Sequence, residues 1–146
     1  MCSMISKQST PKEIGERSEG QIIAAFLRAG EVVLTPFGDS QRYDIVLDQS
    51  GTFVRVQCKT GRISGGSIVF DTCSNNWRTK ARRNYRGDID LFAVYVPATG
   101  KIYLVPVTDV GVRTATLRLK PTRNGQKNRI RLAEIYEYTL PEFPQG

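Results

Sequence analysis

Histidine does not occur anywhere in the 146 residues of this sequence. Its absence excludes zinc sites with histidine ligands, Ser-His-Asp and Cys-His catalysis, and every hydrolytic mechanism in which histidine is the general base. Any hydrolytic chemistry must therefore depend on carboxylates, lysine and a hard metal such as Mg²⁺.

Cysteines and long apolar runs are also scarce. The three cysteines, Cys2, Cys58 and Cys73, are irregularly spaced and include no CxxC pair, so no disulfide framework is indicated. No apolar run approaches the roughly 18 residues that span a bilayer, and the N-terminal residues lack the basic-then-apolar pattern of a signal peptide. We therefore expect a cytoplasmic protein with no membrane partner.

Length and composition are those of an ordinary globular protein, with 40% hydrophobic and 24% charged residues. A chain of this length is large enough for a hydrophobic core and most often forms one domain. We expect a flexible N-terminal arm at residues 1–9 and a single domain at residues 10–146.

The net charge is +7, and the excess is concentrated in two stretches that contain no acidic residue, 77–86 and 113–131. Such clustering is typical of a nucleic-acid-binding surface. A solubilising face or a contact with an acidic protein is the alternative. The candidate nucleic-acid contacts are Arg62, which lies outside both stretches, and Arg78, Lys80, Arg82, Arg83, Arg86, Arg118, Lys120 and Arg123.

A capping box at residues 10–13, with Pro at the first helical position, predicts a helix that ends at Ala29, before Gly30. The expected buried stripe consists of Ile22, Ile23, Phe26 and Leu27. A projection at about 100° per residue places Glu19 near the middle of this stripe. The helix is therefore expected to direct a carboxylate toward the core.

The rest of the chain reads mainly as strands and turns. Expected strands are 31–38, broken at Pro36; 43–48 and 52–60, joined as a hairpin; 66–72; a second hairpin within 91–107; and 113–120. We expect a loop or short helix at 74–87 and a final short helix within 131–140. This order predicts an α/β (α+β) fold with a mixed central sheet flanked by helices.

Polar side chains interrupt the first hairpin, where a buried strand should be apolar. Asp44 should lie opposite residue 56 or 57, and Gln57 and Lys59 share one face of the second strand. If the helix packs on that face, Glu19 meets them there. Two carboxylates, an amide oxygen and an ammonium would then surround one point, and such an oxygen-lined pocket suits Mg²⁺.

These residues would suit phosphodiester hydrolysis. Asp44 is the expected principal metal ligand, Gln57 and the backbone carbonyl of Cys58 supply neutral oxygens, and Glu19 binds the metal or positions water. Lys59 would orient the nucleophile and stabilise the anionic transition state. The alternatives are a solvated surface hairpin and, for Glu19, a structural ion pair with one of three arginines: Arg17, Arg42 or Arg55.

The segments GERSE, TPFGDSQRYDIV, VRVQCKT and IDLFAVYVPATGKIYLVPV together resemble the PD-(D/E)XK nuclease superfamily. More narrowly, they resemble its small homing endonucleases from bacterial group I introns. Gly15 and Glu19 match the first-helix motif, Asp44 the metal-binding Asp, and Gln57 and Lys59 the final motif. Gln57 stands where the superfamily pattern has an acidic residue, which leaves the number of metals open.

The resemblance implies a restriction-endonuclease-like αβββαβ core and a Mg²⁺-dependent DNA endonuclease of the homing type, with Mn²⁺ as a substitute. It also implies double-stranded DNA as substrate, Gly15 as a DNA contact, self-association as a homodimer or homotetramer, and a nucleoid, phage or intron setting. Two alternatives stay open. One is a nuclease resembling Holliday-junction resolvases, and the other is a catalytically inactive DNA-binding module on the same scaffold.

Overall fold

The computed structural model describes residues 8–75, 78–121, 123–125 and 130–140. Its elements are α1 (Pro11–Arg28), β1 (Val32–Leu34), β2 (Ile45–Gln49), β3 (Thr52–Thr60), β4 (Arg62–Ser64), β5 (Ser67–Asp71), β6 (Cys73–Asn75), β7 (Arg82–Asn84), β8 (Leu91–Val96), β9 (Lys101–Pro106), the 3₁₀ helix η1 (Val107–Asp109), β10 (Thr114–Arg118) and α2 (Ala133–Tyr136). Of the predicted N-terminal arm, residues 1–7 lie outside the described residues.

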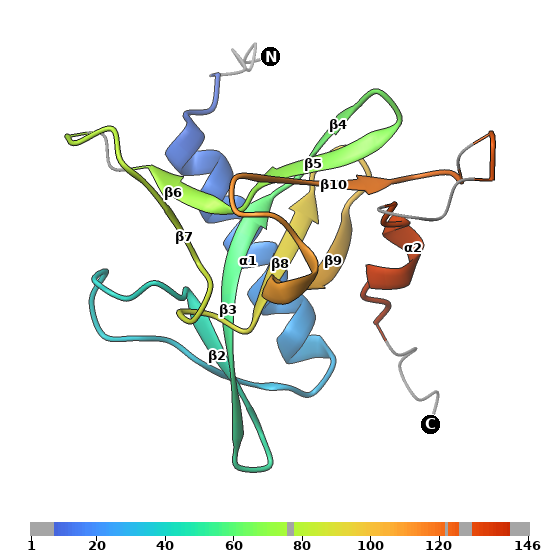
Figure 1. Cartoon of the computed structure of the whole chain (residues 1–146). Coiled ribbons are helices and arrows are strands. Elements are labelled where there is room, and N and C mark those ends of the chain that lie inside the picture. Colours follow the sequence, from blue (N-terminus) through green and yellow to red (C-terminus); the bar gives the residue numbers. More distant parts are fainter. Residues whose placement is uncertain (1–7, 76–77, 122, 126–129, 141–146) are drawn as a thin grey trace, which may run out of the picture.

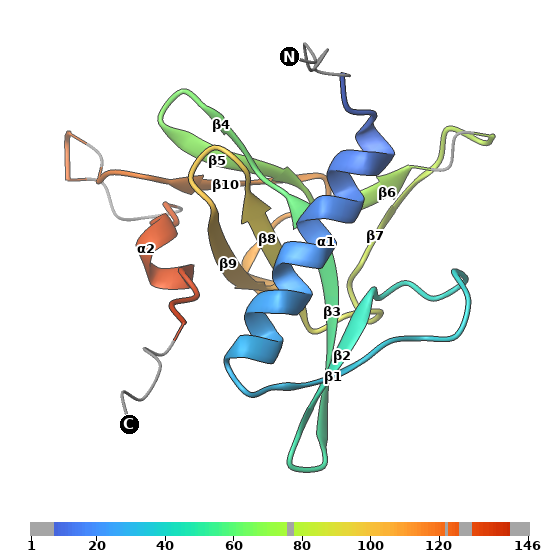
Figure 2. The ribbon, with the colours of Figure 1, turned by 180° about the vertical axis from the view of Figure 1, so that it is seen from behind.

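The centre of the fold is a five-stranded sheet in the order β1-β2-β3-β8-β9. Its strands pair antiparallel except for β3 and β8, which run parallel. Helix α1 lies across one face of this sheet, and a three-stranded sheet in the order β10-β5-β4 lies on the other side (Figures 1 and 2). The expected mixed sheet of an α+β fold is confirmed.

Helix α1 begins as its sequence predicts. The Thr10 hydroxyl accepts a hydrogen bond from the Glu13 backbone N–H at 3.2 Å, while the Glu13 carboxylate accepts one from the Thr10 N–H. The helix ends at Arg28, and Gly30 follows with a φ of 81°. Both ends of the predicted helix are therefore confirmed.

The predicted buried stripe of α1 is partly wrong. Leu27 is 57% exposed, whereas Ser18 and Ala25 are buried together with Ile22 and Phe26. The stripe is rotated because the helix buries a small polar residue: the Ser18 hydroxyl hydrogen-bonds to that of Thr60 on β3, at 2.6 Å. Glu19 consequently lies at the edge of the buried face and is half-buried.

Two apolar cores occupy the two sides of the central sheet. One packs α1 against the sheet, with Ile22, Phe26, Ile45 and Val56 fully or almost fully buried. The other fills the space between the central sheet and the three-stranded sheet, and its members include Phe70, Phe92, Val94 and Leu117. Burial on both faces explains why β8 reads as a continuous apolar run.

The crossover from β3 to β8 differs from the αβββαβ order. In that order a helix connects the two parallel strands, but among the described residues the crossover consists of β4 to β7. The stretch 74–87, expected as a loop or short helix, instead contains β6 and β7, which pair antiparallel as a separate two-stranded ribbon. The final helix is a single short turn, α2. In the described part of the chain, no helix is long and apolar enough to cross a membrane.

Candidate active site

The pairing of β2 with β3 fixes the position of Asp44. Ile45 pairs with Val56 and Asp44 directly precedes Ile45, so Asp44 lies beside Val56, within the expected range of residue 56 or 57. The Asp44 N–H donates to the Val56 carbonyl at 2.9 Å, and the Asp44 Oδ2 accepts from the Cys58 N–H at 2.8 Å. The carboxylate is thus held at the point where β2 begins.

Helix α1 does not cover the face that carries Gln57 and Lys59. It packs on the other face of β3, against Val54, Val56 and Cys58. Glu19 nevertheless lies near Asp44. From the flank of the helix, it lines the same pocket of about 270 Å³ as Asp44 does. The pocket is completed by Tyr43 and by residues of the segment 35–41 between β1 and β2.

The surroundings raise the pKa of both carboxylates. Burial raises the pKa of Glu19, and the negative charges of Asp44 and Glu16 raise it further. Burial also raises the pKa of Asp44, against the opposing effects of the Cys58 N–H and the Lys59 ammonium. Burial raises the pKa of the Cys58 thiol, and the charges of Asp44 and Glu19 raise it further.

The three arginines that could have neutralised Glu19 are engaged elsewhere. Arg17 donates to the Ser9 hydroxyl at 2.7 Å, Arg42 pairs with Asp88 at 3.2 Å, and Arg55 pairs with Asp90 at 3.2 Å. Among the residues that the structure describes, neither Glu19 nor Asp44 forms an ion pair. The pocket therefore holds the two carboxylates of Glu19 and Asp44, with Asp39 also on its lining, and neither Glu19 nor Asp44 is neutralised by an ion pair with a described residue.

This donor set fits a hard divalent cation. Mg²⁺ requires only one or two carboxylates and completes its shell with neutral oxygens and water. The raised pKa values indicate that the pocket disfavours its own negative charge, which a cation would relieve. Within the described residues no cluster of three or more Cys, Asp or Glu side chains could hold a metal, so neutral oxygens would have to complete the site.

The Cys58 backbone carbonyl is one such oxygen. In a strand the N–H and the C=O of one residue point to the same side. Since the Cys58 N–H points at Asp44, its carbonyl faces the same edge, beyond the end of β2. Neither Gln57 nor Lys59 is among the residues that line the pocket.

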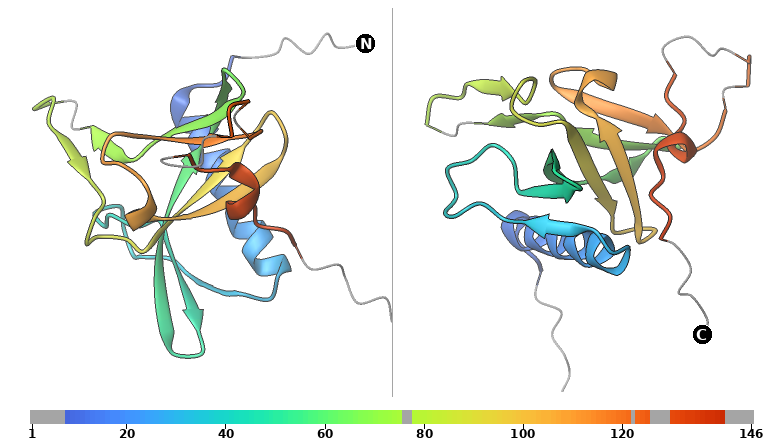
Figure 3. Two further views of the ribbon diagram at one scale, coloured as in Figure 1. Left: turned by 45° about the vertical axis from the view of Figure 1, so that its right-hand side comes forward. Right: turned by 90° about the horizontal axis from the view of Figure 1, so that it is seen from below.

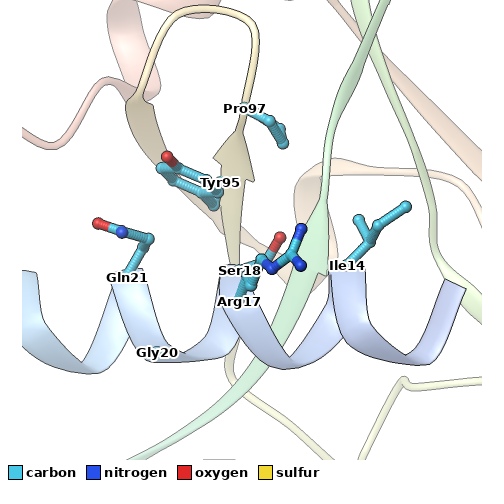
Figure 4. Close-up of a pocket in the computed structure, with 7 residues that line it drawn as sticks. All are labelled: Ile14, Arg17, Ser18, Gly20, Gln21, Tyr95 and Pro97. Carbon is cyan, nitrogen blue, oxygen red and sulfur yellow. The ribbon is translucent and has the colours of Figure 1, made fainter. Parts of the chain in front are cut away.

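A second pocket, of about 430 Å³, lies on the opposite flank of α1 (Figure 4). Figure 4 shows Arg17, Ser18 and Gln21 of the helix facing Tyr95 and Pro97 at the end of β8. None of the residues that line this pocket carries a carboxylate. It offers no metal ligands of the required kind, and the carboxylate pocket is the better candidate for chemistry.

The two basic stretches do not form one surface. The first includes β7 of the β6–β7 ribbon, on the side of the molecule where the 35–43 segment also lies, and the second includes β10, on the opposite side (Figures 1 and 3). The candidate contacts Arg78, Lys80, Arg82, Arg83 and Arg86 belong to the ribbon side, Arg118, Lys120 and Arg123 to the other side, and Arg62 to β4. Gly15, by contrast, is exposed on α1, where an added Cβ would meet no atom within 4 Å.

Sequence patterns missed Tyr85 and one role of Arg42. Tyr85 is 5% exposed and its hydroxyl lies 3.4 Å from the Lys59 Nζ. Arg42, considered only as a partner of Glu19, instead contacts the ribbon and the Tyr85 ring. An aromatic residue within a basic stretch is only a weak indication of a buried site residue. The stretch 77–86 shows no periodicity that separates buried from exposed positions.

The raised pKa values of Glu19 and Asp44 predict a pH-dependent instability. A folded state that holds protons more tightly than the unfolded chain loses stability as pH rises through that range. In metal-free buffer, the free energy of unfolding of the wild type should fall, relative to the variant Glu19→Gln/Asp44→Asn, as pH rises above the ordinary values of 3.8 for Asp and 4.5 for Glu.

Urea unfolding from about pH 4 to about pH 7 would measure this difference. Adding Mg²⁺ near neutral pH should raise the unfolding free energy of the wild type but not that of the variant. If the difference in unfolding free energy between the wild type and the variant stayed constant with pH, this result would contradict the raised pKa values.

Comparisons with known proteins agree with this geometry. A model of the family described as PD-(D/E)XK endonuclease matches residues 9–139, a range that contains all four candidate site residues. Among solved structures, the chain is similar to a bacterial homing endonuclease, I-Ssp6803I, with a TM-score of 0.64 and 29% sequence identity over 89% of this chain and 88% of that chain. None of the curated proteins gives a significant match.

Proposed function

The chain belongs to the family of PD-(D/E)XK endonucleases, and from this premise we propose that it cuts double-stranded DNA at a specific site and requires a divalent cation. The similarity to a homing endonuclease supports the homing type of activity. The observation that carries the proposal is the pocket in which Glu19 and Asp44 lie together, where neither carboxylate forms an ion pair with a described residue.

Each candidate residue has a distinct role in the proposal. Asp44 and Glu19 hold the cation, Mg²⁺ or Mn²⁺, with the Cys58 carbonyl and Gln57 as neutral oxygen donors. When bound, the cation supplies Lewis-acid stabilisation of the negative charge that develops on the scissile phosphate. The Lys59 ammonium stabilises the same developing charge and orients the attacking water.

Cleavage of a DNA panel tests this proposal. Purified protein with Mg²⁺ should cut a long duplex library at a defined sequence, whereas Lys59→Ala should cut at a rate lower by about 100-fold or more. Cleavage that survives in Lys59→Ala, or that occurs only without added cation, would contradict the site. A four-way junction cut regardless of sequence would replace the homing function with a junction-resolving one.

Gln57 favours a second candidate function, a DNA-binding module without catalysis. The Gln removes one anionic metal ligand that the PD-(D/E)XK pattern supplies, so the pocket would hold a cation less tightly. This candidate predicts salt-sensitive DNA binding with no nicking of any substrate under Mg²⁺ or Mn²⁺. The same panel therefore separates the two candidates.

The β6–β7 ribbon is the DNA-binding surface in this proposal, because it lies on the same side of the molecule as the segment between β1 and β2, which lines the carboxylate pocket (Figure 1). Arg82 is exposed, whereas Arg83 shares Asp88 with Arg42. The side chains of the second stretch, Arg118, Lys120 and Arg123, lie on the other side of the molecule. They would contact DNA only if the DNA wrapped around to that side. We also propose that residues 10–146 form one nuclease domain and that two or four copies bind a long target together.

Replacing Arg82 with Ala should weaken DNA binding in a salt-dependent way. Each phosphate contact releases counterions, so the slope of log affinity against log salt should fall by about one unit. Fluorescence anisotropy with a labelled duplex between about 50 and 200 mM salt would measure it. Lys120→Ala is the matched control and should leave the slope unchanged; equal effects of the two variants would mean that DNA wraps both sides.

A further inference from the structure

Tyr85 occupies a position between the DNA-binding ribbon and the catalytic lysine. It follows directly after β7 and is 5% exposed. Its ring packs edge-on against Phe92 of β8, with centroids 5.6 Å apart and planes at 89°. The ring is therefore fixed by the core, while its hydroxyl faces the side chain of Lys59.

Lys59 is held by Tyr85 in two ways. The Nζ atom lies 3.4 Å from the Tyr85 hydroxyl oxygen, to which it donates a hydrogen bond, and 4.8 Å from the ring centroid. Both contacts favour an ammonium: the first is charge-assisted, and the second is a cation–π interaction. Among the described residues, the Lys59 side chain makes no other hydrogen bond or ion pair.

Arg42 fixes the same tyrosine to the base of the ribbon. Its guanidinium carbon lies 4.1 Å from the Tyr85 ring centroid, and its Nε atom lies 3.2 Å from the Asp88 carboxylate. The guanidinium also donates to the Asn84 carbonyl at 2.7 Å and to the Ser74 hydroxyl, one partner on each ribbon strand. Arg42 lies two residues before Asp44 in the chain. The segment that leads into Asp44 therefore contacts the ribbon directly through the Arg42 side chain.

We propose that Tyr85 is a positioning residue that restrains the Lys59 ammonium, and that Arg42 links this arrangement to the DNA-binding ribbon. The inference rests on the proposed function, in which Lys59 stabilises the developing charge. A lysine has four rotatable side-chain bonds, and a free ammonium at this position would sample many places away from the phosphate. Restraint by Tyr85 removes that freedom before DNA arrives, which is the condition for efficient electrostatic stabilisation.

The variant Tyr85→Phe tests the inference, because it keeps the buried ring and removes only the hydroxyl. Its single-turnover cleavage rate should fall about tenfold while the DNA dissociation constant changes less than about twofold, since a hydrogen bond to a charged group is lost and the binding surface is intact. In a Lys59→Ala background the same substitution should have no further effect. Tyr95→Phe on β8, a half-buried tyrosine outside the site, is the control and should cleave as the wild type does.

A second readout does not depend on cleavage. The ¹⁵N relaxation of the Lys59 ammonium, assigned by its loss in Lys59→Arg, should show a more ordered group than that of the exposed Lys120. Tyr85→Phe should lower the order of the Lys59 ammonium toward that of Lys120, although the ring contact that Phe keeps should retain part of it. A wild-type Lys59 as mobile as Lys120, or additive effects of the Tyr85 and Lys59 substitutions on cleavage, would overturn the inference.

The two readouts also separate this inference from the proposed function. A wild type that cuts no DNA, but whose Lys59 ammonium loses order in Tyr85→Phe, would refute the nuclease proposal and keep the positioning role of Tyr85. A wild type that cuts DNA as fast as Tyr85→Phe does would keep the nuclease and refute the positioning role.

Discussion

Asp44→Asn should lower the cleavage rate by about 1000-fold or more while leaving the protein at least as stable as the wild type. The loss is expected because the substitution removes the charge of the principal metal ligand. Stability is retained because the Asn side-chain oxygen can still accept the hydrogen bond that the Cys58 N–H gives to Asp44 at 2.8 Å. Burial raises the pKa of Asp44, so a neutral side chain is favoured there in the metal-free folded state.

Single-turnover cleavage and thermal unfolding of the two proteins would measure both effects. Asp48→Asn is a matched control on the same strand, where the carboxylate accepts only from the Gly51 N–H of the hairpin turn, at 3.0 Å. This variant should cleave normally. Residual cleavage above about one tenth in Asp44→Asn would remove Asp44 from the role of principal ligand, whatever the effect on stability.

Gly61→Ala should destabilise the fold by about 2 kcal/mol. A Cβ added at Gly61 would lie 2.9 Å from Ile68 Cγ2, 2.9 Å from Val94 Cγ1 and 3.0 Å from Val96 Cγ2. All three neighbours are fully buried and β-branched, so their rotamers have little freedom to move away. Gly61 also follows Lys59 by two residues, so a shift of the chain there should disturb the site as well.

Urea unfolding would measure this cost, with Gly20→Ala as the control. Gly20 lies within α1, and a Cβ added there would meet no atom within 4 Å. Alanine in a helix interior is favoured over glycine, so the control should be stabilised by up to about 1 kcal/mol. Equal effects of the two substitutions would show that the close approach at Gly61 is not maintained in solution.

Local signals in the sequence predicted most of the scaffold. The capping box, the turns at 48–51 and 98–100, and the strand alternation of 52–60 are set by neighbouring residues, and the structure has the expected elements at each place. The placement of Asp44 opposite residue 56 or 57 also followed from the short turn alone. For the same reason the sequence alone predicted that three of the four candidate residues, Asp44, Gln57 and Lys59, belong to one hairpin.

What the sequence could not provide is the side on which each element packs. Alternation showed that Gln57 and Lys59 share a face, but only the three-dimensional arrangement assigns Val54, Val56 and Cys58 to the helix side. The predicted stripe of α1 failed at Leu27 for a similar reason, since a buried Ser18 with a hydrogen bond to Thr60 outweighs an apolar residue at the edge. Packing of a polar residue depends on a partner distant in the chain, and periodicity does not report it.

The parallel pairing of β3 with β8 has a consequence for how the enzyme acquires its activity. The hairpin that carries Asp44 and Lys59 joins residues close in the chain and can form early, whereas β8 can align beside β3 only after segment 61–90 has closed. Tyr85 and its anchor Phe92 arrive with that late closure. A nascent or partly folded chain therefore carries the hairpin with the proposed metal ligands but without a restrained lysine, and cutting competence should appear only with the slowest long-range step of folding.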